Sequence, residues 1–516
     1  MINKKVITSF LQHELNNYDW MKDESRASLE ATVNELVPKP TLVRLWDHQL
    51  VCFLLIEALK RFMLFIDMGG GKTLITLSTI SYRKQRGESP KAIVFVPYIT
   101  SVETWIEETN KHAPDLRCVP LYGTTQENYD KLTTATGDLF VICYQSAVAM
   151  MAEPIKKTIG KRKKKWTINP AFIRDTFSSF DMLVMDEIHR CKSVTSLTYR
   201  LCLAISGHTE YVLGLTGTPF GRDLQDLWPQ FNLVDFGETL GDTFGLYREA
   251  FFTKKEKYWG GYEYKFQKRL MGTLKRVIKN ASIRYSVDEF ADMPPAIPIT
   301  IHVKPHDGIA AYATKALEAI NQMQVSGGKY RAIESKYLQL RQLSSGFVSL
   351  KGEDTDNVQV AFDENPKLDA LQGLIEDMPH GCKMVVFHHF RYTNKLISDR
   401  LKVMKVKHAR IYGKTKDPIA ELRRFKDEPD VTVLVINSKS GSSSLNLQIA
   451  NYCCFFEQPD SAIDRQQAER RVWRPGQDKR VFFLDVLMSG TADKTMLKMN
   501  KEGKSLLQAL LDGVKL

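Results

Sequence analysis

At 516 residues the chain is too long to fold around one hydrophobic core, so we expect two or three domains. Its 43% hydrophobic and 26% charged residues are ordinary globular values and exclude a largely disordered protein. Lysine and arginine outnumber aspartate and glutamate by 72 to 60, and the net charge of +12 favours a polyanionic partner such as nucleic acid.

The sequence shows no targeting or disulfide signal. The polar N-terminus has no apolar signal region. The longest apolar stretch, Val51 to Leu59, contains Glu57 and is too short to span a bilayer. The eight cysteines show no C-x-x-C spacing, which argues against a zinc site or a disulfide framework. We therefore expect a soluble, intracellular protein with no membrane partner.

Short apolar runs recur along the chain, separated by stretches of helical length. Such runs predict buried parallel strands alternating with helices, which is the pattern of an α/β fold. They fall into two sets and therefore predict two parallel-sheet lobes. The first set is Phe62–Ile66, Ala92–Val96, Leu139–Tyr144, Met182–Met185 and Tyr211–Leu215, and the second is Met384–Phe387, Ala409–Tyr412, Val431–Ile436, Tyr452–Phe456 and Val481–Val486.

The segment between the two sets is rich in aromatic residues, lysine and glutamate. Helical spacing in Ala310–Gln324 and Ala332–Leu343 predicts a mainly helical insertion between the lobes. The predicted domains are an N-terminal helical extension (1–34), lobe 1 (35–235), the insertion and linker (236–365), lobe 2 (366–500) and a C-terminal helix (501–516).

A glycine-rich turn follows the first predicted strand. Gly69, Gly70 and Gly71 precede Lys72 and Thr73. The backbone N–H groups of such a turn can surround phosphates while the lysine ammonium binds the outer ones, and the threonine hydroxyl can hold Mg²⁺. A glycine turn with an exposed lysine is the alternative, but the strand before it and the helix after it disfavour that interpretation.

An acidic pair follows a later strand of the first set. Asp186 could anchor Mg²⁺, and Glu187 could orient or activate the attacking water. A solvated acidic loop is the alternative. Together with the glycine turn, the pair predicts nucleoside-triphosphate hydrolysis with ATP and Mg²⁺.

In chain order, the segments that follow the strands resemble those of superfamily 2 ATPases, specifically the Swi/Snf-type DNA translocases. The resemblance covers about residues 40–510 and implies two RecA-like lobes. In lobe 1 it rests on Leu45–Gln49 (the adenine-reading Gln motif), Asp67–Thr73 (motif I), Val96-Pro97 with Trp105 and Glu108 (motif Ia), Asp186–Ser193 (the DExH signature) and Leu215–Pro219 with Leu224, Leu227 and Trp228 (motif III). In lobe 2 it rests on Asn365–Leu368 and Val385–Phe387 (leading into motif IV), Ser440–Leu447 (motif V), Gln467–Gln477 (motif VI) and Gly490-Thr491 with Lys504 (the closing segment).

The chain departs from the family pattern in three places. Ile66 stands where a strict Walker A has glycine, and Gly441–Ser444 replaces the usual Gly-Gly-x-Gly of motif V. In motif VI, Arg470 and Trp473 replace the usual Asp and His. No chromatin-reading module is recognisable. We therefore expect a compact member, acting in the cytoplasm of a bacterial cell or a virus-infected host, and not a eukaryotic nucleosome remodeller.

The resemblance implies roles for the remaining site residues. Arg471 and Arg474 are three residues apart, which predicts one face of a helix. From lobe 2 they could act on the γ-phosphate as arginine fingers, with Gln467 near the attacking water, although an arginine cluster facing DNA or solvent is the alternative. The catalytic set is Lys72, Asp186, Glu187, Gln467, Arg471 and Arg474; the nucleotide-binding set is Gln49, Gly69, Gly70, Gly71, Lys72 and Thr73; Thr73 and Asp186 would hold Mg²⁺; and His189, Thr216, Gly217 and Thr218 would couple the site to the rest of the motor.

Nucleic-acid contacts are assigned to motif residues by resemblance alone, namely Pro97, Ser440 and Asn446. The basic run that contains Lys163 and Lys164 could clamp a duplex backbone, or it could be a solubilising loop. The aromatic segment Tyr258–Tyr262 could stack on bases, although packing of a small core is favoured.

The expected function is ATP-driven translocation on double-stranded or branched DNA, with remodelling of protein–DNA or branched structures by a monomer. Two alternatives stay open. One is a strand-separating or branch-migration helicase. The other is an ATP-switched DNA-binding protein, which the serine-rich motif V suggests.

Overall fold

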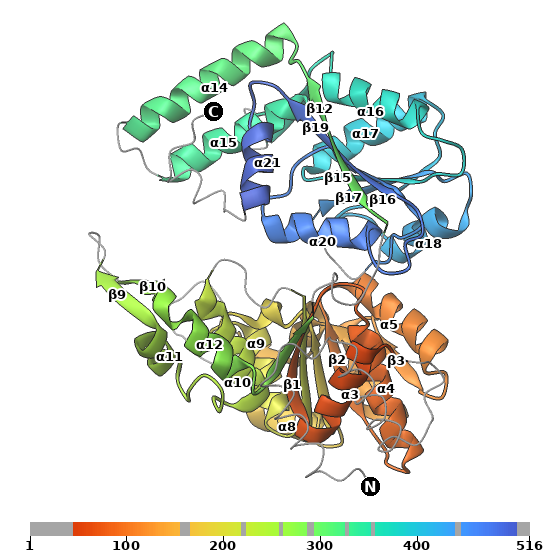
Figure 1. Cartoon of the computed structure of the whole chain (residues 1–516). Coiled ribbons are helices and arrows are strands. Elements are labelled where there is room, and N and C mark those ends of the chain that lie inside the picture. Colours follow the sequence, from red (N-terminus) through yellow and green to blue (C-terminus); the bar gives the residue numbers. More distant parts are fainter. Residues whose placement is uncertain are drawn as a thin grey trace. The chain divides into compact units, whose positions relative to one another are not determined.

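The computed structural model describes residues 45–154, 166–217, 223–256, 262–285, 294–325, 330–351, 357–438 and 445–502. The chain divides into two compact units, Met1–Ala291 (unit 1) and Asp292–Leu516 (unit 2). Each unit has a parallel sheet with helices on both faces (Figure 1). The predicted extension 1–34, and residues 503–516 of the predicted C-terminal helix, lie outside the described residues.

The sheet of unit 1 has seven parallel strands in the order β11-β1-β8-β7-β2-β4-β3. Side chains of β1 (Arg61–Ile66) alternate between its two faces: Phe62, Leu64 and Ile66 enter one core, and Met63 and Phe65 enter the other. Its other strands are β2 (Ala92–Val96), β3 (Cys118–Leu121), β4 (Leu139–Cys143), β7 (Met182–Asp186), β8 (Tyr211–Thr216) and β11 (Ser282–Tyr285).

Three helices supply the core on one face of this sheet: α3 (Asp47–Leu59), α4 (Lys72–Gln85) and α5 (Ile99–His112). The other face is covered by a second group: α6 (Thr125–Thr134), α7 (Tyr144–Met151), α8 (Pro170–Thr176), α9 (Leu197–Ser206), α10 (Leu227–Asp235), α11 (Phe244–Phe251) and α12 (Met271–Ile278). Two small ribbons, β5–β6 (Ala152–Pro154, Trp166–Ile168) and β9–β10 (Phe252–Glu256, Tyr262–Phe266), complete the unit.

The sheet of unit 2 has six parallel strands in the order β12-β19-β18-β15-β17-β16. Helices α16 (Pro366–Glu376) and α17 (Arg391–Val403) pack on one face, and α18 (Pro418–Asp427) and α20 (Ala462–Val472) on the other. Its strands are β12 (Ala296–Val303), β15 (Met384–His388), β16 (His408–Ile411), β17 (Val433–Asn437), β18 (Tyr452–Phe455) and β19 (Val481–Met488).

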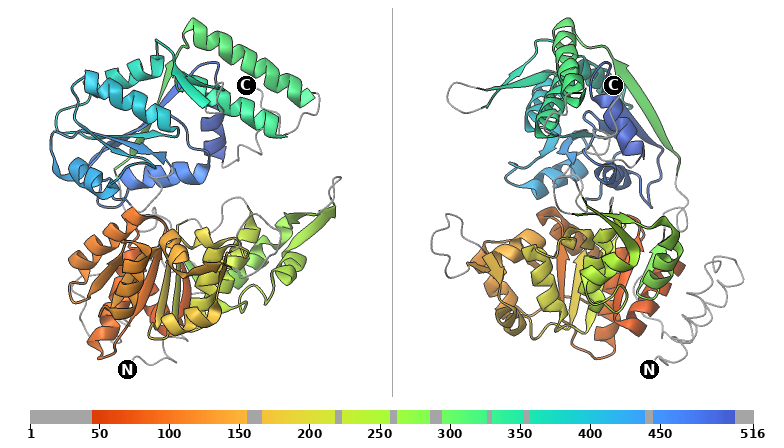
Figure 2. Two further views of the ribbon diagram at one scale, coloured as in Figure 1. Left: turned by 180° about the vertical axis from the view of Figure 1, so that it is seen from behind. Right: turned by 90° about the vertical axis from the view of Figure 1, so that its left-hand side faces the viewer.

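A third core joins α14 (Asp307–Val325) and α15 (Tyr330–Ser344) to α21 (Asp493–Glu502), and the two long helices form an extended pair in both views of Figure 2. The ribbon β13–β14 (Phe347–Lys351, Asn357–Ala361) follows α15. No helix in the described part of the chain has the length and apolarity needed to cross a membrane.

The predicted α/β fold with two parallel-sheet lobes is confirmed, and all ten predicted apolar runs form strands. The segment 236–365, predicted as a mainly helical insertion, contributes to both units and adds an edge strand to each sheet. β11 pairs with β1, and β12 pairs with β19. At the end of β11, the carbonyl of Tyr285 accepts a hydrogen bond of 3.1 Å from the N–H of Asp67, the residue that follows β1.

Candidate nucleotide-binding site

The glycine turn between β1 and α4 has the backbone geometry expected of a phosphate loop. Gly69 and Gly71 have φ values of +86° and +83°, in the left-handed region that favours glycine. A Cβ at Gly71 would lie 2.3 Å from Nε2 of Gln49, so glycine is also required sterically. Because α4 begins at Lys72, directly after Gly71, the unpaired N–H groups of its first turn can bind an anion beside the loop.

The first turn of α3 is tied to this loop by hydrogen bonds. His48 Nε2 lies 2.9 Å from the carbonyl oxygen of Gly70, and Gln49 Nε2 donates to the same oxygen at 3.3 Å. Gln49 Oε1 accepts from the N–H of Trp46 at 2.9 Å. The predicted adenine-reading glutamine therefore also fixes the phosphate loop, and His48, which the sequence analysis did not assign, shares that role.

Lys72 lies at the carboxyl end of β1. Its Nζ donates to the carbonyl oxygens of Ile66 at 2.7 Å and Asp67 at 3.4 Å. Its positive charge acts to lower the pKa of both Asp186 and Glu187, so the three charged groups share one electrostatic site. Thr73 follows in the first turn of α4 and is half-buried.

Asp186 ends β7 and is held from two sides. Trp105 Nε1 on α5 donates to Asp186 Oδ2 at 3.3 Å, and the Tyr144 hydroxyl donates to the Asp186 carbonyl oxygen at 3.0 Å. Burial, with a contribution from the neighbouring Glu187 charge, raises the pKa of Asp186. Trp105 belongs to the motif Ia resemblance and Tyr144 to a predicted strand end, but no sequence signal showed that either residue contacts Asp186.

Glu187, His189 and Thr216 form a compact polar triad. Thr216 Oγ1 donates to Glu187 Oε2 at 3.1 Å, and His189 Nδ1 lies 3.2 Å from both oxygens. An ionised carboxylate can only accept, so His189 Nδ1 carries a proton. Burial opposes ionisation of Glu187, but the hydrogen bonds from His189 and Thr216 and the charges of His189 and Lys72 outweigh it and lower its pKa.

The backbone at Glu187 is strained, and its neighbours are tightly packed. Its φ of +52° lies in the left-handed region, which costs a residue with a Cβ about 1–2 kcal/mol. A Cβ at Gly217, the residue after Thr216, would lie 3.2 Å from the Ile66 carbonyl oxygen. The ends of β1, β7 and β8 therefore converge, and this part of the predicted set is brought together.

The same edge of the sheet fits a magnesium nucleotide. Mg²⁺ in phosphate sites is usually held by one or two protein oxygens together with phosphates and water. Asp186 and Thr73 supply a carboxylate and a hydroxyl of that kind. The described residues contain no group of three or more His, Cys, Asp or Glu that would form an all-protein metal cage.

In unit 2, α20 carries the first part of the predicted motif VI. Gln467 and Arg471 are buried on this helix, and Arg471 Nη1 lies 3.5 Å from the Leu445 carbonyl oxygen. Gln477 Nε2 donates to the carbonyl oxygens of Gln448 at 2.9 Å and of Val472 at 3.1 Å. Hydrogen bonds therefore join motifs V and VI into one body.

The prediction that Arg471 and Arg474 share one helical face is wrong. Helix α20 ends at Val472, and Trp473 is already extended, with φ −97° and ψ 94°. Pro475 explains this ending because a residue that precedes proline is disfavoured in the helical region. Arg474 therefore lies on the turn after the helix and is half-buried.

The predicted nucleic-acid residues lie in different environments. Pro97 is buried at the end of β2, and Asn446 Oδ1 accepts from the Gln448 N–H at 3.2 Å. Thr218, Ser440, Lys163, Lys164 and the aromatic residues Tyr258 and Trp259 lie outside the described residues.

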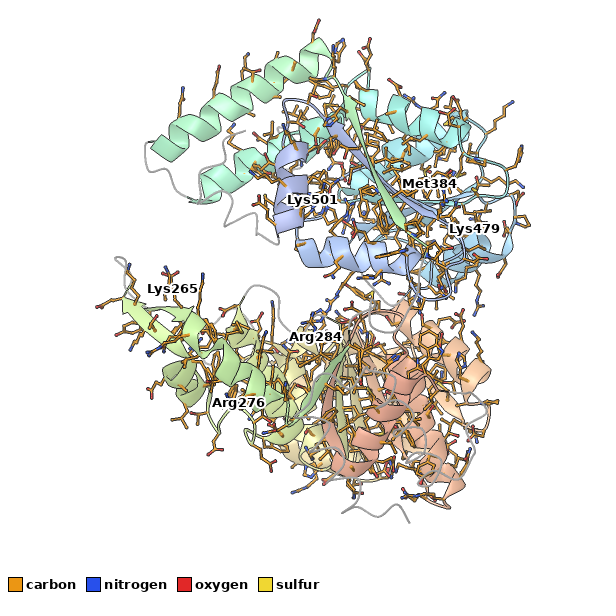
Figure 3. All side chains as sticks on the ribbon, viewed as in Figure 1. Lys265, Arg276, Arg284, Met384, Lys479 and Lys501 are labelled. Carbon is orange, nitrogen blue, oxygen red and sulfur yellow. The ribbon has the colours of Figure 1, made fainter. Side chains whose placement is uncertain are left out.

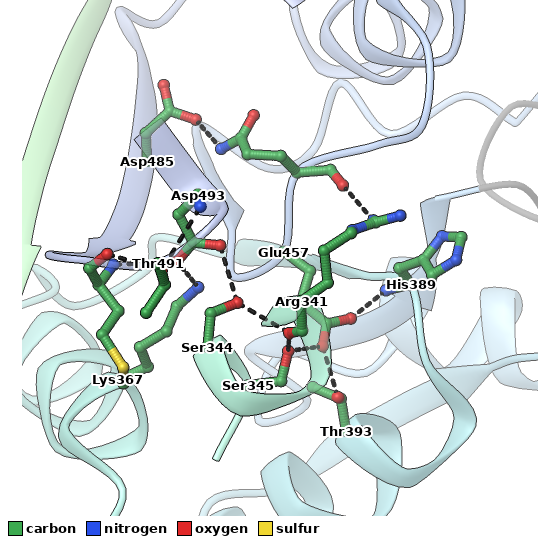
Figure 4. A network of polar contacts seen from close by, with 12 residues as sticks. Arg341, Ser344, Ser345, Lys367, His389, Thr393, Glu457, Asp485, Thr491 and Asp493 are labelled. Carbon is green, nitrogen blue, oxygen red and sulfur yellow. Dashed lines mark hydrogen bonds and ion pairs between the residues drawn. The ribbon is translucent and has the colours of Figure 1, made fainter. Parts of the chain in front are cut away.

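A buried polar network in unit 2 anchors α15 (Figure 4). Lys367 Nζ, fully buried, contacts Asp493 Oδ2 at 2.8 Å, and the Ser344 hydroxyl donates to Asp493 Oδ1 at 2.9 Å. Glu457 accepts from the Ser345 hydroxyl, and at 2.6 Å from the Thr393 hydroxyl. The end of α15 is thus joined to α16, to α17 and to the start of α21.

Two sequence families match these two units. Residues 20–345 match the SNF2-related domain, and residues 366–476 match the helicase conserved C-terminal domain. The chain belongs to the SNF2-related family. The predicted family resemblance is thereby confirmed.

Curated relatives of this SNF2-related protein include large and small proteins. The transcription regulatory protein SNF2 of Saccharomyces cerevisiae is 23% identical over 86% of this chain and 26% of its own length. Protein p41 of Acyrthosiphon pisum secondary endosymbiont phage 1 is 23% identical over 92% of this chain and 98% of its own. A human SWI/SNF-related regulator of chromatin containing a DEAD/H box is 20% identical, and the chain spans 46% of it. The chain thus spans under half of the length of the yeast and human relatives.

A solved structure of the Sulfolobus solfataricus SWI2/SNF2 ATPase core in complex with double-stranded DNA is also similar. It aligns with 90% of this chain and 92% of its own, at 20% identity and a TM-score of 0.38.

Proposed function

We propose that this SNF2-related protein is a DNA-stimulated ATPase that translocates on double-stranded DNA and remodels protein–DNA or branched DNA structures. The observation that carries the proposal is the convergence of Lys72, Asp186 and the Glu187–His189–Thr216 triad at one edge of the sheet of unit 1. Family membership gives the substrate class, since SNF2 relatives include a core solved with double-stranded DNA.

Lys72 and the N–H groups of the phosphate loop would bind the ATP phosphates, and Gln49 would contact the adenine. Mg²⁺, held by Asp186 and Thr73, would supply positive charge that neutralises the phosphates. Glu187, kept ionised by its hydrogen bonds and by neighbouring positive charge, is suited to accept or orient the proton of the attacking water.

Arg471 and Arg474 are proposed to add positive charge at the transferred phosphate, with Gln467 near the water. Such arginines contribute on the order of 10³–10⁵ in rate in related phosphoryl-transfer systems. Asn446 and Ser440 are proposed to contact DNA phosphates. We also propose cytoplasmic action in a bacterial or virus-infected cell, which the phage relative of nearly equal length supports.

ATPase assays with no DNA, single strands, duplexes, forks and four-way junctions test the proposal. We expect duplex-containing DNA to raise the rate at least about tenfold, and triplex displacement without duplex melting. Absence of stimulation by duplex DNA would sink the proposal, and ATP-dependent melting of a tailed duplex would indicate a strand-separating helicase instead.

Two variants test the site itself. Lys72→Ala should abolish hydrolysis, whereas Lys84→Ala near the other end of α4, where the side chain is partly exposed and pairs with Asp138, should retain it. Glu187→Gln should abolish turnover and remodelling while ATP and DNA still bind. Retained remodelling in that variant would indicate an ATP-switched binding protein.

A further inference from the structure

The net positive charge of the chain is concentrated in one short segment of unit 1. Residues 252–284 contain ten lysines and arginines against two glutamates, a net charge of +8 out of +12 for the whole chain. The segment comprises the β9–β10 hairpin, helix α12 and the edge strand β11. None of the motifs that build the nucleotide site lies in it.

The base of the hairpin is anchored rigidly. Phe252 and Phe266 face each other across the ribbon, and both pack with the aromatic residues of α11. The Arg248 guanidinium on α11 lies 3.9 Å from the centre of the Phe244 ring and 4.5 Å from that of Tyr264, so it stacks between the helix and the hairpin. The hairpin therefore projects from unit 1 in a fixed direction (Figure 1).

The outer part of the hairpin carries cations that no carboxylate neutralises. The strand register places Lys255 and Lys265 on the face opposite the packed aromatic residues. Both are exposed, as is Lys268 just beyond β10, and no described acidic side chain forms an ion pair with any of the three. Figure 3 shows Lys265 among nitrogen-tipped side chains on the hairpin, and Arg276 on the neighbouring helix α12.

An exposed aromatic ring accompanies these charges. Tyr262 is 53% exposed, and the Lys254 ammonium lies 3.6 Å from the centre of its ring. The ring holds this ammonium in place, so part of its side-chain entropy is already lost before any anion binds. Rigidly presented ammonium groups beside an exposed aromatic ring suit a polyanionic backbone better than an apolar partner.

We propose that the β9–β10 hairpin and the adjoining Lys268 form an additional phosphate-backbone contact for duplex DNA, separate from the motif residues. The inference rests on the proposed DNA-dependent function. Lysines on the edges of a two-stranded ribbon also prevent strand-to-strand aggregation, and that purely protective role is the competing explanation.

The test is the triple variant Lys255→Gln, Lys265→Gln, Lys268→Gln, compared with Lys111→Gln, Arg117→Gln, Lys131→Gln. The control removes the same number of exposed cations from unit 1, and these are also without ion pairs to described carboxylates. Duplex affinity is measured between about 50 and 200 mM salt, together with DNA-free ATPase and thermal melting.

Each lost phosphate contact lowers the logarithmic salt dependence of binding by about 0.9. The hairpin variant should therefore bind duplex about tenfold to several hundredfold more weakly, with a slope reduced by about 2–3 and unchanged DNA-free ATPase and melting. The control should bind like the wild type.

Equal duplex binding by the wild type and the hairpin variant would overturn the inference, as would an equal loss in hairpin and control variants. In both cases DNA stimulation of the wild type would leave the proposed function intact. A wild-type protein that binds no duplex would overturn both.

Discussion

Thr216→Val is the sharpest test of the triad around Glu187. Thr216 is fully buried, and its hydroxyl donates to Glu187 Oε2 at 3.1 Å and lies 3.2 Å from His189 Nδ1. A hydrogen bond to a charged group contributes about 1.5–3 kcal/mol, and this one, being long, belongs at the lower end. Valine has a similar shape and adds a buried methyl group worth about 0.8 kcal/mol, so the global stability should fall by less than about 1 kcal/mol.

The effect on hydrolysis should be larger than the effect on stability. Loss of about 1.5 kcal/mol of positioning at Glu187 corresponds to roughly a tenfold lower DNA-stimulated kcat, with the KM for ATP little changed. Thr216→Ser keeps the hydroxyl and should retain most of the rate. Steady-state ATPase and urea unfolding are measured on all three proteins. Equal rates for the valine and serine variants, whether high or low, would refute the assigned hydrogen bond.

Three other predictions concern individual contacts. Lys367→Met should destabilise the protein in urea by about 3–5 kcal/mol because it leaves Asp493 buried without its cation, and adding Asp493→Asn should restore most of the loss. Gly71→Ala should weaken nucleotide binding at least about tenfold, whereas Gly87→Ala, with a similar φ of +82° but open space around the new Cβ, should cost only about 1–2 kcal/mol of stability. Burial raises the pKa of Glu57 to about 7, so its ionisation opposes folding as the pH rises from about 4.5 towards 7; Glu57→Gln should match the wild type at about pH 4 and exceed its unfolding free energy by roughly 2–3 kcal/mol at about pH 8.

The strands of both sheets were predictable because buried parallel strands are continuous apolar runs. The edge strands were not. β11, Ser-Ile-Arg-Tyr, has no apolar run, and β12 alternates Ile297, Ile299, Ile301 and Val303 with other residues, a period-two signal inside a segment interpreted as mainly helical. Edge strands carry this weaker pattern because they are less completely buried.

The core of the site was predictable from local sequence, whereas its supporting contacts were not. Lys72 and Asp186 follow strands within recognisable motifs, and parallel strands bring their carboxyl ends to one edge. The bond from Trp105 to Asp186 joins residues 81 positions apart and depends on how α5 packs against the sheet. The end of α20 before Arg474 could have been read from Pro475, whose effect on the preceding residue is local.

The pairing of β11 with β1 has a mechanical consequence. Tyr285 is the last described residue of unit 1, the chain continues from it into unit 2, and its carbonyl is bonded to Asp67 at the root of the phosphate loop. A tension on this covalent connection would be transmitted in shear along the ladder of β11 and β1, directly beside the loop. The strand that leads out of the ATPase unit is thus positioned to feel force and the state of the nucleotide pocket together.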